Sequence, residues 1–107
     1  MRKFKAIIKR PDEEIGHMTW VSDSLENLQK HVEGHIQALH LTRELVLICN
    51  EDGKILGLEP NFPLPWGDVV VGTVIICGQS GEEFADIPCS RKEWAELLAS
   101  FDRKGQN

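Results

Sequence analysis

The sequence has no apolar stretch long enough to cross a membrane. Its longest uncharged apolar run, Val69 to Cys77, is about half of the roughly 20 residues that a membrane helix requires. The basic residues 1–5 lead into only a short apolar run, so the apolar region of a signal peptide is also absent. We therefore expect a single soluble domain, residues 1–107, that stays in the cytoplasm and has no membrane partner.

Cysteine is scarce. The three cysteines, Cys49, Cys77 and Cys89, form an odd count. Two of them end strongly apolar segments, where a thiol usually behaves as a small hydrophobic group. We expect all three thiols to be reduced and structural.

Positive charge is also in short supply, since the formal net charge is −5. A nucleic-acid-binding protein normally carries a basic patch, because neutralising phosphates supplies most of its affinity. The cationic residues that do cluster, at positions 2–10, are followed closely by Asp12, Glu13 and Glu14. We therefore expect no direct nucleic-acid partner.

The residues that carry chemistry lack the spacing that catalysis or metal binding needs. His31 and His35 are four apart, but Gly34 interrupts the helix between them and no third ligand is suitably placed. Nothing in the sequence brings a histidine to Cys49 or Cys77, neighbouring acids in loops point apart, and no glycine pattern matches a phosphate loop. We expect neither an enzyme nor a metal or cofactor site.

Apolar segments separated by turn residues predict a mainly antiparallel sheet of five or six strands. Asn50 to Gly53 has the composition of a tight hairpin turn, with Gly53 at positive φ. Gly72 is typical of a bulge or a close backbone approach. The expected strands are Phe4–Lys9, Met18–Val21, Ile36–Leu41, Glu44–Cys49, Lys54–Leu58 and Val69–Cys77.

Two amphipathic helices are expected to cover one face of this sheet, which gives an α+β fold. Asp23 is the expected N-cap of the first helix, and Gly34 is expected to end it in a left-handed conformation. Ser90 and Glu93 form a capping box for the second helix. The expected core comprises Ile7, Leu28, Val32, Leu45, Leu47, Val74, Ile76, Trp94, Leu97 and Phe101.

The segment from Asn61 to Gly67 is the best candidate for a contact surface. Its prolines favour a stiff, polyproline-like arm along which Phe62, Leu64 and Trp66 alternate. Stiffness lowers the entropic cost of binding, and tryptophan is enriched in interface hot spots. Alternatively, these side chains fold back over an open edge or face of the sheet, and the sequence leaves both readings open.

Three segments, Leu28–Gly34, Leu45–Asn61 and Gly72–Ile76, resemble a known family. The pattern is an apolar strand ending in Asn-Glu-x-Gly-Lys, a Gly-Leu-x-x-Asn return and a later Gly-Thr strand. It is similar to the family of domain of unknown function 3846, small proteins of bacteria, phages and conjugative elements. The likeness spans roughly residues 4–87 and brings no catalytic residue with it.

The resemblance implies a small accessory protein of a phage or mobile element. We expect a non-catalytic protein–protein interaction module whose partner is a host or phage protein, with inhibition of an anti-phage defence as one role. The candidate binding residues are Phe62, Leu64, Trp66, Asn50 and Asn61. The alternative is a small-ligand or nucleotide-binding domain. Mimicry of DNA is a further variant of the interaction role, although the net charge is modest for it.

Overall fold

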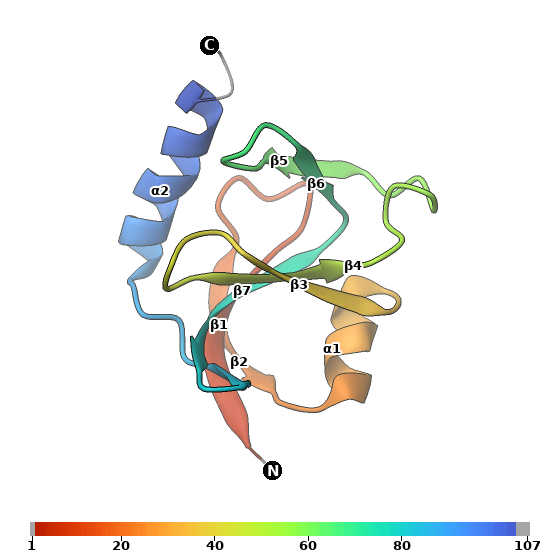
Figure 1. Ribbon diagram of the computed structural model, residues 1–107, viewed down its shortest axis with the longest axis vertical. Helices are drawn as coiled ribbons and strands as arrows, with labels where there is room; N and C mark the ends of the chain where they lie inside the picture. Colours follow the sequence, from red (N-terminus) through yellow and green to blue (C-terminus); the bar gives the residue numbers. More distant parts are fainter. Residues whose placement is uncertain (1, 105–107) are drawn as a thin grey trace.

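The computed structural model describes residues 2–104, which form an antiparallel six-stranded sheet, a separate two-stranded hairpin and two helices (Figure 1). The main sheet has the order β2-β1-β7-β4-β3, and β8 pairs with β7. This confirms the α+β class. The elements are β1 (Lys3–Lys9), β2 (His17–Ser22), α1 (Leu25–Val32), β3 (Ile36–His40), β4 (Val46–Asn50), β5 (Pro60–Pro63), β6 (Val69–Val71), β7 (Val74–Ser80), β8 (Glu83–Ala85) and α2 (Arg91–Lys104).

The two helices lie on opposite faces of the sheet, so the expectation that both cover one face is wrong. Along β1, Ile7 belongs to the buried cluster that contains α2, whereas Ile8 belongs to the cluster that contains α1. Successive side chains on a strand point to opposite faces. Because the central strands are apolar at successive positions, both faces need a cover.

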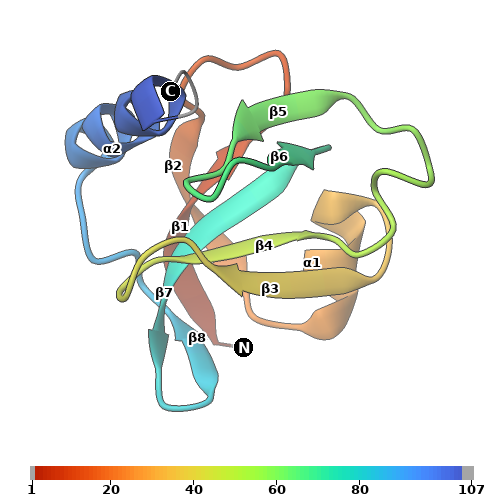
Figure 2. The same cartoon turned by 45° about the horizontal axis from the view of Figure 1, so that its top comes forward.

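The expected core is confirmed except at Leu97, which is half-buried at its margin. The α1 cluster is mainly aliphatic. The α2 cluster also contains the aromatic residues Phe62, Trp94 and Phe101. Figure 2 shows that the β5–β6 hairpin lies next to α2, so a helix and a hairpin share this face of the sheet.

Both helices begin at serine caps, but the first helix differs in detail from expectation. Its N-cap is Ser24 rather than Asp23, and the Ser24 hydroxyl accepts the Asn27 N–H. The left-handed residue after it is Glu33, with φ of 65°. Gly34 is needed instead for close packing against Asn50, because a Cβ there would lie 2.7 Å from the Asn50 amide nitrogen. The capping box of α2 forms as predicted between Ser90 and Glu93.

The segment after β4 is not the hairpin partner that the turn signal predicts. Residues 51–57 form successive turns, in which the Leu56 N–H donates to the Asp52 carbonyl and the Leu58 N–H to the Gly53 carbonyl. Strand β4 already pairs with β3 on one side and β7 on the other, so neither edge is open. Gly53 does not adopt the predicted positive φ.

The long apolar run at 69–77 is divided between two sheets. Gly72 adopts a φ of 78°, and its backbone lies so close to Leu58 that a Cβ would be 2.8 Å from the Leu58 Cδ1. The close approach predicted from the glycine is therefore confirmed. The bend sends β6 into the hairpin with β5 and β7 into the centre of the main sheet.

Candidate functional site

Two of the predicted contact residues, Phe62 and Leu64, are buried in the core. Phe62 packs edge-on to Trp94 at 5.8 Å and stacks on Phe101 at 6.3 Å between ring centroids. Residues 60–63 form a paired strand rather than a free polyproline-like arm. The alternative, in which these side chains fold back over the sheet, is therefore correct for both residues, and neither projects from an exposed arm.

Asn61 holds the hairpin to the end of β1. Its amide nitrogen donates to the carbonyls of Lys9 and Gly72, at 2.9 and 2.7 Å. Its amide oxygen accepts from the Lys9 ammonium at 2.5 Å. Lys9 is buried, which lowers its pKa, and its ammonium lies 5.7 Å from the centre of the Phe62 ring. The Asn61 side chain is thus engaged in internal hydrogen bonds.

Asn50, at the end of β4, has the same kind of internal role. Its amide nitrogen donates to the Val32 carbonyl at 3.0 Å, and its oxygen accepts the Asp52 N–H at 2.7 Å. The first bond fastens α1 to β4, and the second starts the turns at 51–57. Both asparagines of the predicted site are therefore engaged in internal hydrogen bonds that shape the fold.

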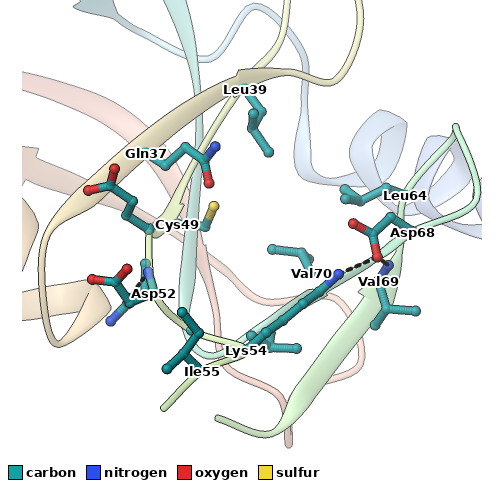
Figure 3. Close-up of a pocket in the computed structure, with 14 residues that line it drawn as sticks. Gln37, Leu39, Cys49, Asp52, Lys54, Ile55, Leu64, Asp68, Val69 and Val70 are labelled. Atoms are coloured by element: carbon teal, nitrogen blue, oxygen red, sulfur yellow. Dashed lines mark hydrogen bonds and ion pairs between the residues drawn. The ribbon is translucent and has the colours of Figure 1, made fainter. Parts of the chain in front are cut away.

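A groove of about 300 Å³ lies where the hairpin and the main sheet diverge (Figure 3). We call it the β3–β6 groove. Strands β3 and β4 form one wall, β6 forms the other, and the turns at 51–55 close one end. The residues that line it are Gln37, Leu39, Cys49, Asn50, Glu51, Asp52, Gly53, Lys54, Ile55, Leu64, Asp68, Val69, Val70 and Val71.

The interior of the β3–β6 groove is mainly apolar. Leu39, Leu64 and Val70 form part of its walls, and the Cys49 sulfur points into it (Figure 3). Burial raises the pKa of the Cys49 thiol, which keeps it in the unreactive neutral form. The groove is therefore suited to holding apolar side chains rather than to nucleophilic chemistry.

An ion pair bridges the two loops that flank the groove. The Lys54 ammonium bonds to the Asp68 carboxylate, which also accepts the Val69 N–H (Figure 3). The hydrogen bond from Lys54, followed by that from Val69, lowers the pKa of Asp68. Turns 51–57 and the tip of the hairpin are thereby held side by side.

Comparison with known proteins gives a family but no function. The family model described as domain of unknown function (DUF3846) matches residues 2–99. The chain belongs to this family. No curated protein and no solved structure matches the chain.

Four exposed apolar side chains of this DUF3846 member lie on the two bridged loops and at the first residue of β6. Ile55 is 87% exposed, Leu56 59%, Trp66 53% and Val69 38%. We call these four residues the apolar rim. Of the five predicted binding residues, Trp66 is the one that remains exposed. Ile55 was missed because its place in a predicted strand favoured burial.

Metal clusters and membrane-spanning helices are absent from the described part of the DUF3846 domain. Within residues 2–104, no group of three or more His, Cys, Asp or Glu side chains is placed to hold a metal ion. Over the same range, no helix has both the length and the apolarity to span a membrane. The three cysteines are free, and burial, with a contribution from Asp23, raises the pKa of Cys77 to about 12.

Proposed function

We propose that this DUF3846 domain is a non-catalytic, cytoplasmic module that binds a segment of a partner protein in the β3–β6 groove. The observation that carries the proposal is the apolar rim beside that groove. Moving side chains such as Ile55 and Trp66 out of water lowers the free energy. Clustered exposed apolar groups typically mark interaction sites. A bound partner would cover them.

The charge around the groove favours a partner segment that is apolar and basic. Glu51 and Asp52 are exposed at its end, and neither takes part in an ion pair among residues 2–104. The single lysine of the lining, Lys54, is already paired with Asp68. Opposite charges across an interface speed association and fix its register. Lysine or arginine side chains flanking an apolar residue therefore suit this groove.

The open edge of β3 favours an extended segment. The Leu41 N–H bonds to Leu45 and the Glu51 N–H to His35, so the ladder places the hydrogen-bonded pairs at odd-numbered residues of β3. The peptide groups of Ile36, Ala38 and His40 consequently point away from β4, at the edge of the sheet. An extended segment can add to such an edge through main-chain hydrogen bonds.

The family resemblance supplies the biological setting of the proposal. We infer an accessory protein of a phage or mobile element whose target is a host or phage protein, with inhibition of an anti-phage defence as one role. Such a role requires occupation of a target rather than turnover. The buried, neutral thiols and the internal use of Asn50 and Asn61 are consistent with a module that does no chemistry.

The test is a quantitative capture experiment with matched variants. Wild-type protein, the double variant Ile55→Ser/Trp66→Ala and the control Trp20→Ala are used as bait in host extract. Trp20 is a good control because it is 59% exposed, much like Trp66, but lies on β2 at the far edge of the sheet. The captured protein is then purified, and its affinity for each bait is measured.

We expect the double variant to lose at least about 2 kcal/mol of binding free energy, because truncated interface hot spots typically cost this much. The control should bind like wild type. Equal binding of the partner by wild type and the double variant would place the interface elsewhere and refute the proposal.

A further inference from the structure

A second hollow, of about 560 Å³, lies away from the β3–β6 groove, where the ends of β1 and α1 meet the start of β2. We call it the basic hollow. Its polar lining consists mainly of Arg10, His17, Asn27, Lys30, His31 and Thr73. No residue of this set lines the β3–β6 groove. Its volume falls in the range of roughly 300–1,000 Å³ that is common for small-molecule sites.

The hollow is lined by positive charges, although the molecule as a whole is negatively charged. The chain carries a net charge of −5, yet Arg10 and Lys30 both line the hollow. Neither makes an ion pair among residues 2–104. Two carboxylates are near: Glu33 lies in the lining, and Glu13 bonds to His17 at 3.1 Å and accepts the Arg10 backbone N–H at 2.9 Å. Because neither carboxylate pairs with the Arg10 or Lys30 side chain, both permanent cations remain available to a bound anion.

His31 lies at the centre of this positive field. It is half-buried, and burial followed by the positive charges of Lys30, Arg10 and His17 lowers its pKa. These groups come from α1, from β2 and from the residue that follows β1, so the fold brings like charges together at an energetic cost. An anion in the hollow would reverse that cost, because it attracts all four groups.

The hollow also offers neutral hydrogen-bonding groups. The Thr73 hydroxyl makes no hydrogen bond within the described part of the chain. The Asn27 amide nitrogen donates to the Ser22 carbonyl, which fixes the orientation of that side chain at the wall. Ile8 provides an apolar surface beside them. Guanidinium, ammonium and hydroxyl donors around one space form the usual set for a phosphate group.

We propose that the basic hollow binds a small phosphate-bearing anion, either inorganic phosphate or the phosphate of a nucleotide-sized molecule. Arg10 and Lys30 supply the charge, and Thr73 supplies a neutral donor. His31 adds a third positive charge when it is protonated. This site is independent of the proposed protein interaction, and either proposal can fail without the other.

The test is calorimetric titration of the whole protein with inorganic phosphate and, separately, with adenosine monophosphate. We expect Arg10→Gln and Lys30→Gln each to weaken binding of both probes by about tenfold, since each removes a charge-assisted hydrogen bond. Both residues are exposed, so the variants should fold normally. Tighter binding of adenosine monophosphate would identify an organic ligand, and equal binding would identify free phosphate.

Lys92→Gln is the matched control. Lys92 is an exposed lysine on α2 that does not line the hollow, and its replacement changes the net charge by the same amount as Lys30→Gln. It should leave both affinities unchanged. Equal weakening by Lys30→Gln and Lys92→Gln would show only long-range attraction and overturn the proposal, as would the absence of binding by wild type.

Sulfate serves for the pH dependence because it keeps its charge over the range studied. A bound anion favours protonated His31, so the pKa of His31 is higher in the complex and sulfate affinity rises as the pH falls from about 8 towards the lowered pKa of His31 in the free protein. His17, Glu13 and Glu33 are the other groups near His31 that titrate. His31→Gln should remove most of the pH dependence of sulfate affinity, whereas His17→Gln should retain most of it. An unchanged profile in His31→Gln would exclude a role for His31.

Discussion

The two faces of the main sheet are closed in different ways. One face is covered by α1, which follows β1 and β2 directly in the chain and packs Leu28 and Val32 into a mainly aliphatic cluster. The other face is covered by α2 together with the β5–β6 hairpin, which meet in the cluster of Phe62, Trp94 and Phe101. The hairpin also diverges from β3 and β4, and the β3–β6 groove lies in this gap, with no α2 residue in its lining.

The comparison indicates where stability and function reside. The two-piece face gains its stability from large aromatic contacts that join distant segments, while apolar side chains beside the β3–β6 groove are left in water. On the face covered by α1, the polar hollow lies at the end of the helix. The four predictions that follow test this division, beginning with the largest expected effect.

Trp94→Ala should remove about 3–5 kcal/mol of the free energy of unfolding, because it leaves a large cavity between α2 and the hairpin. The variant also loses the hydrogen bond from the Trp94 indole to the Ile15 carbonyl, at 3.0 Å. Leu28→Ala, on the other face, should cost less, about 2–3 kcal/mol. Urea denaturation measures both. A larger loss for Leu28→Ala would show that the α1 face, and not the face covered by α2 and the hairpin, contributes more to stability.

Asn61→Ala should cost about 2 kcal/mol, since the Lys9 and Gly72 carbonyls and the Lys9 ammonium all lose a partner. Removing the buried ammonium as well, in Lys9→Met/Asn61→Ala, should cost less than the sum of the two single changes. The free energies of unfolding of the four proteins give the coupling. Strictly additive values would show that the bond between the Lys9 ammonium and the Asn61 side chain does not help to fasten the hairpin.

Leu97→Ala should cost about 1–2 kcal/mol, near or below the low end for a buried leucine, because Leu97 is only half-buried against the α2 cluster. Thermal and urea unfolding would measure it. A loss below about 0.5 kcal/mol, as for an ordinary surface position, would mean that this turn of α2 does not pack on the core.

Trp66→Ala should change the free energy of unfolding by less than about 0.5 kcal/mol, because the side chain is half-exposed at the tip of the hairpin. Its effect should appear in partner binding instead. A variant that unfolds several degrees earlier yet binds its partner normally would show that Trp66 covers the core and does not contribute to the interface.

Much of the fold could be predicted because its signals are local. Apolar runs correctly predict β1, β2, β3 and β4, and the Ser90–Glu93 capping box correctly predicts the start of α2. The failures concern information that is not local. The turn signal at 50–53 is genuine, but β4 is already paired on both sides, so residues 54–58 have no edge to join.

The candidate site was harder to predict than the fold, for a related reason. Phe62 and Trp66 have the same apolar character and lie four residues apart, yet one is 5% and the other 53% exposed. The difference depends on α2, which packs on Phe62 from a distant part of the sequence. Asn61 likewise finds its partner Lys9 only in the folded chain. Side-chain type alone could not separate core from surface here.

The central place of β7 also bears on how the chain folds. The β1–β2 and β3–β4 pairs join neighbouring segments, so each can form early. Neither can join the other until β7 is available, because Ile76 pairs with Ile7 on one side and Leu47 on the other. During synthesis on the ribosome, the two hairpins therefore expose apolar surfaces to water until β7 has been made. Completion of the sheet is then the slow step, and substitutions in β7 should lower the folding rate more than equally destabilising substitutions in β2.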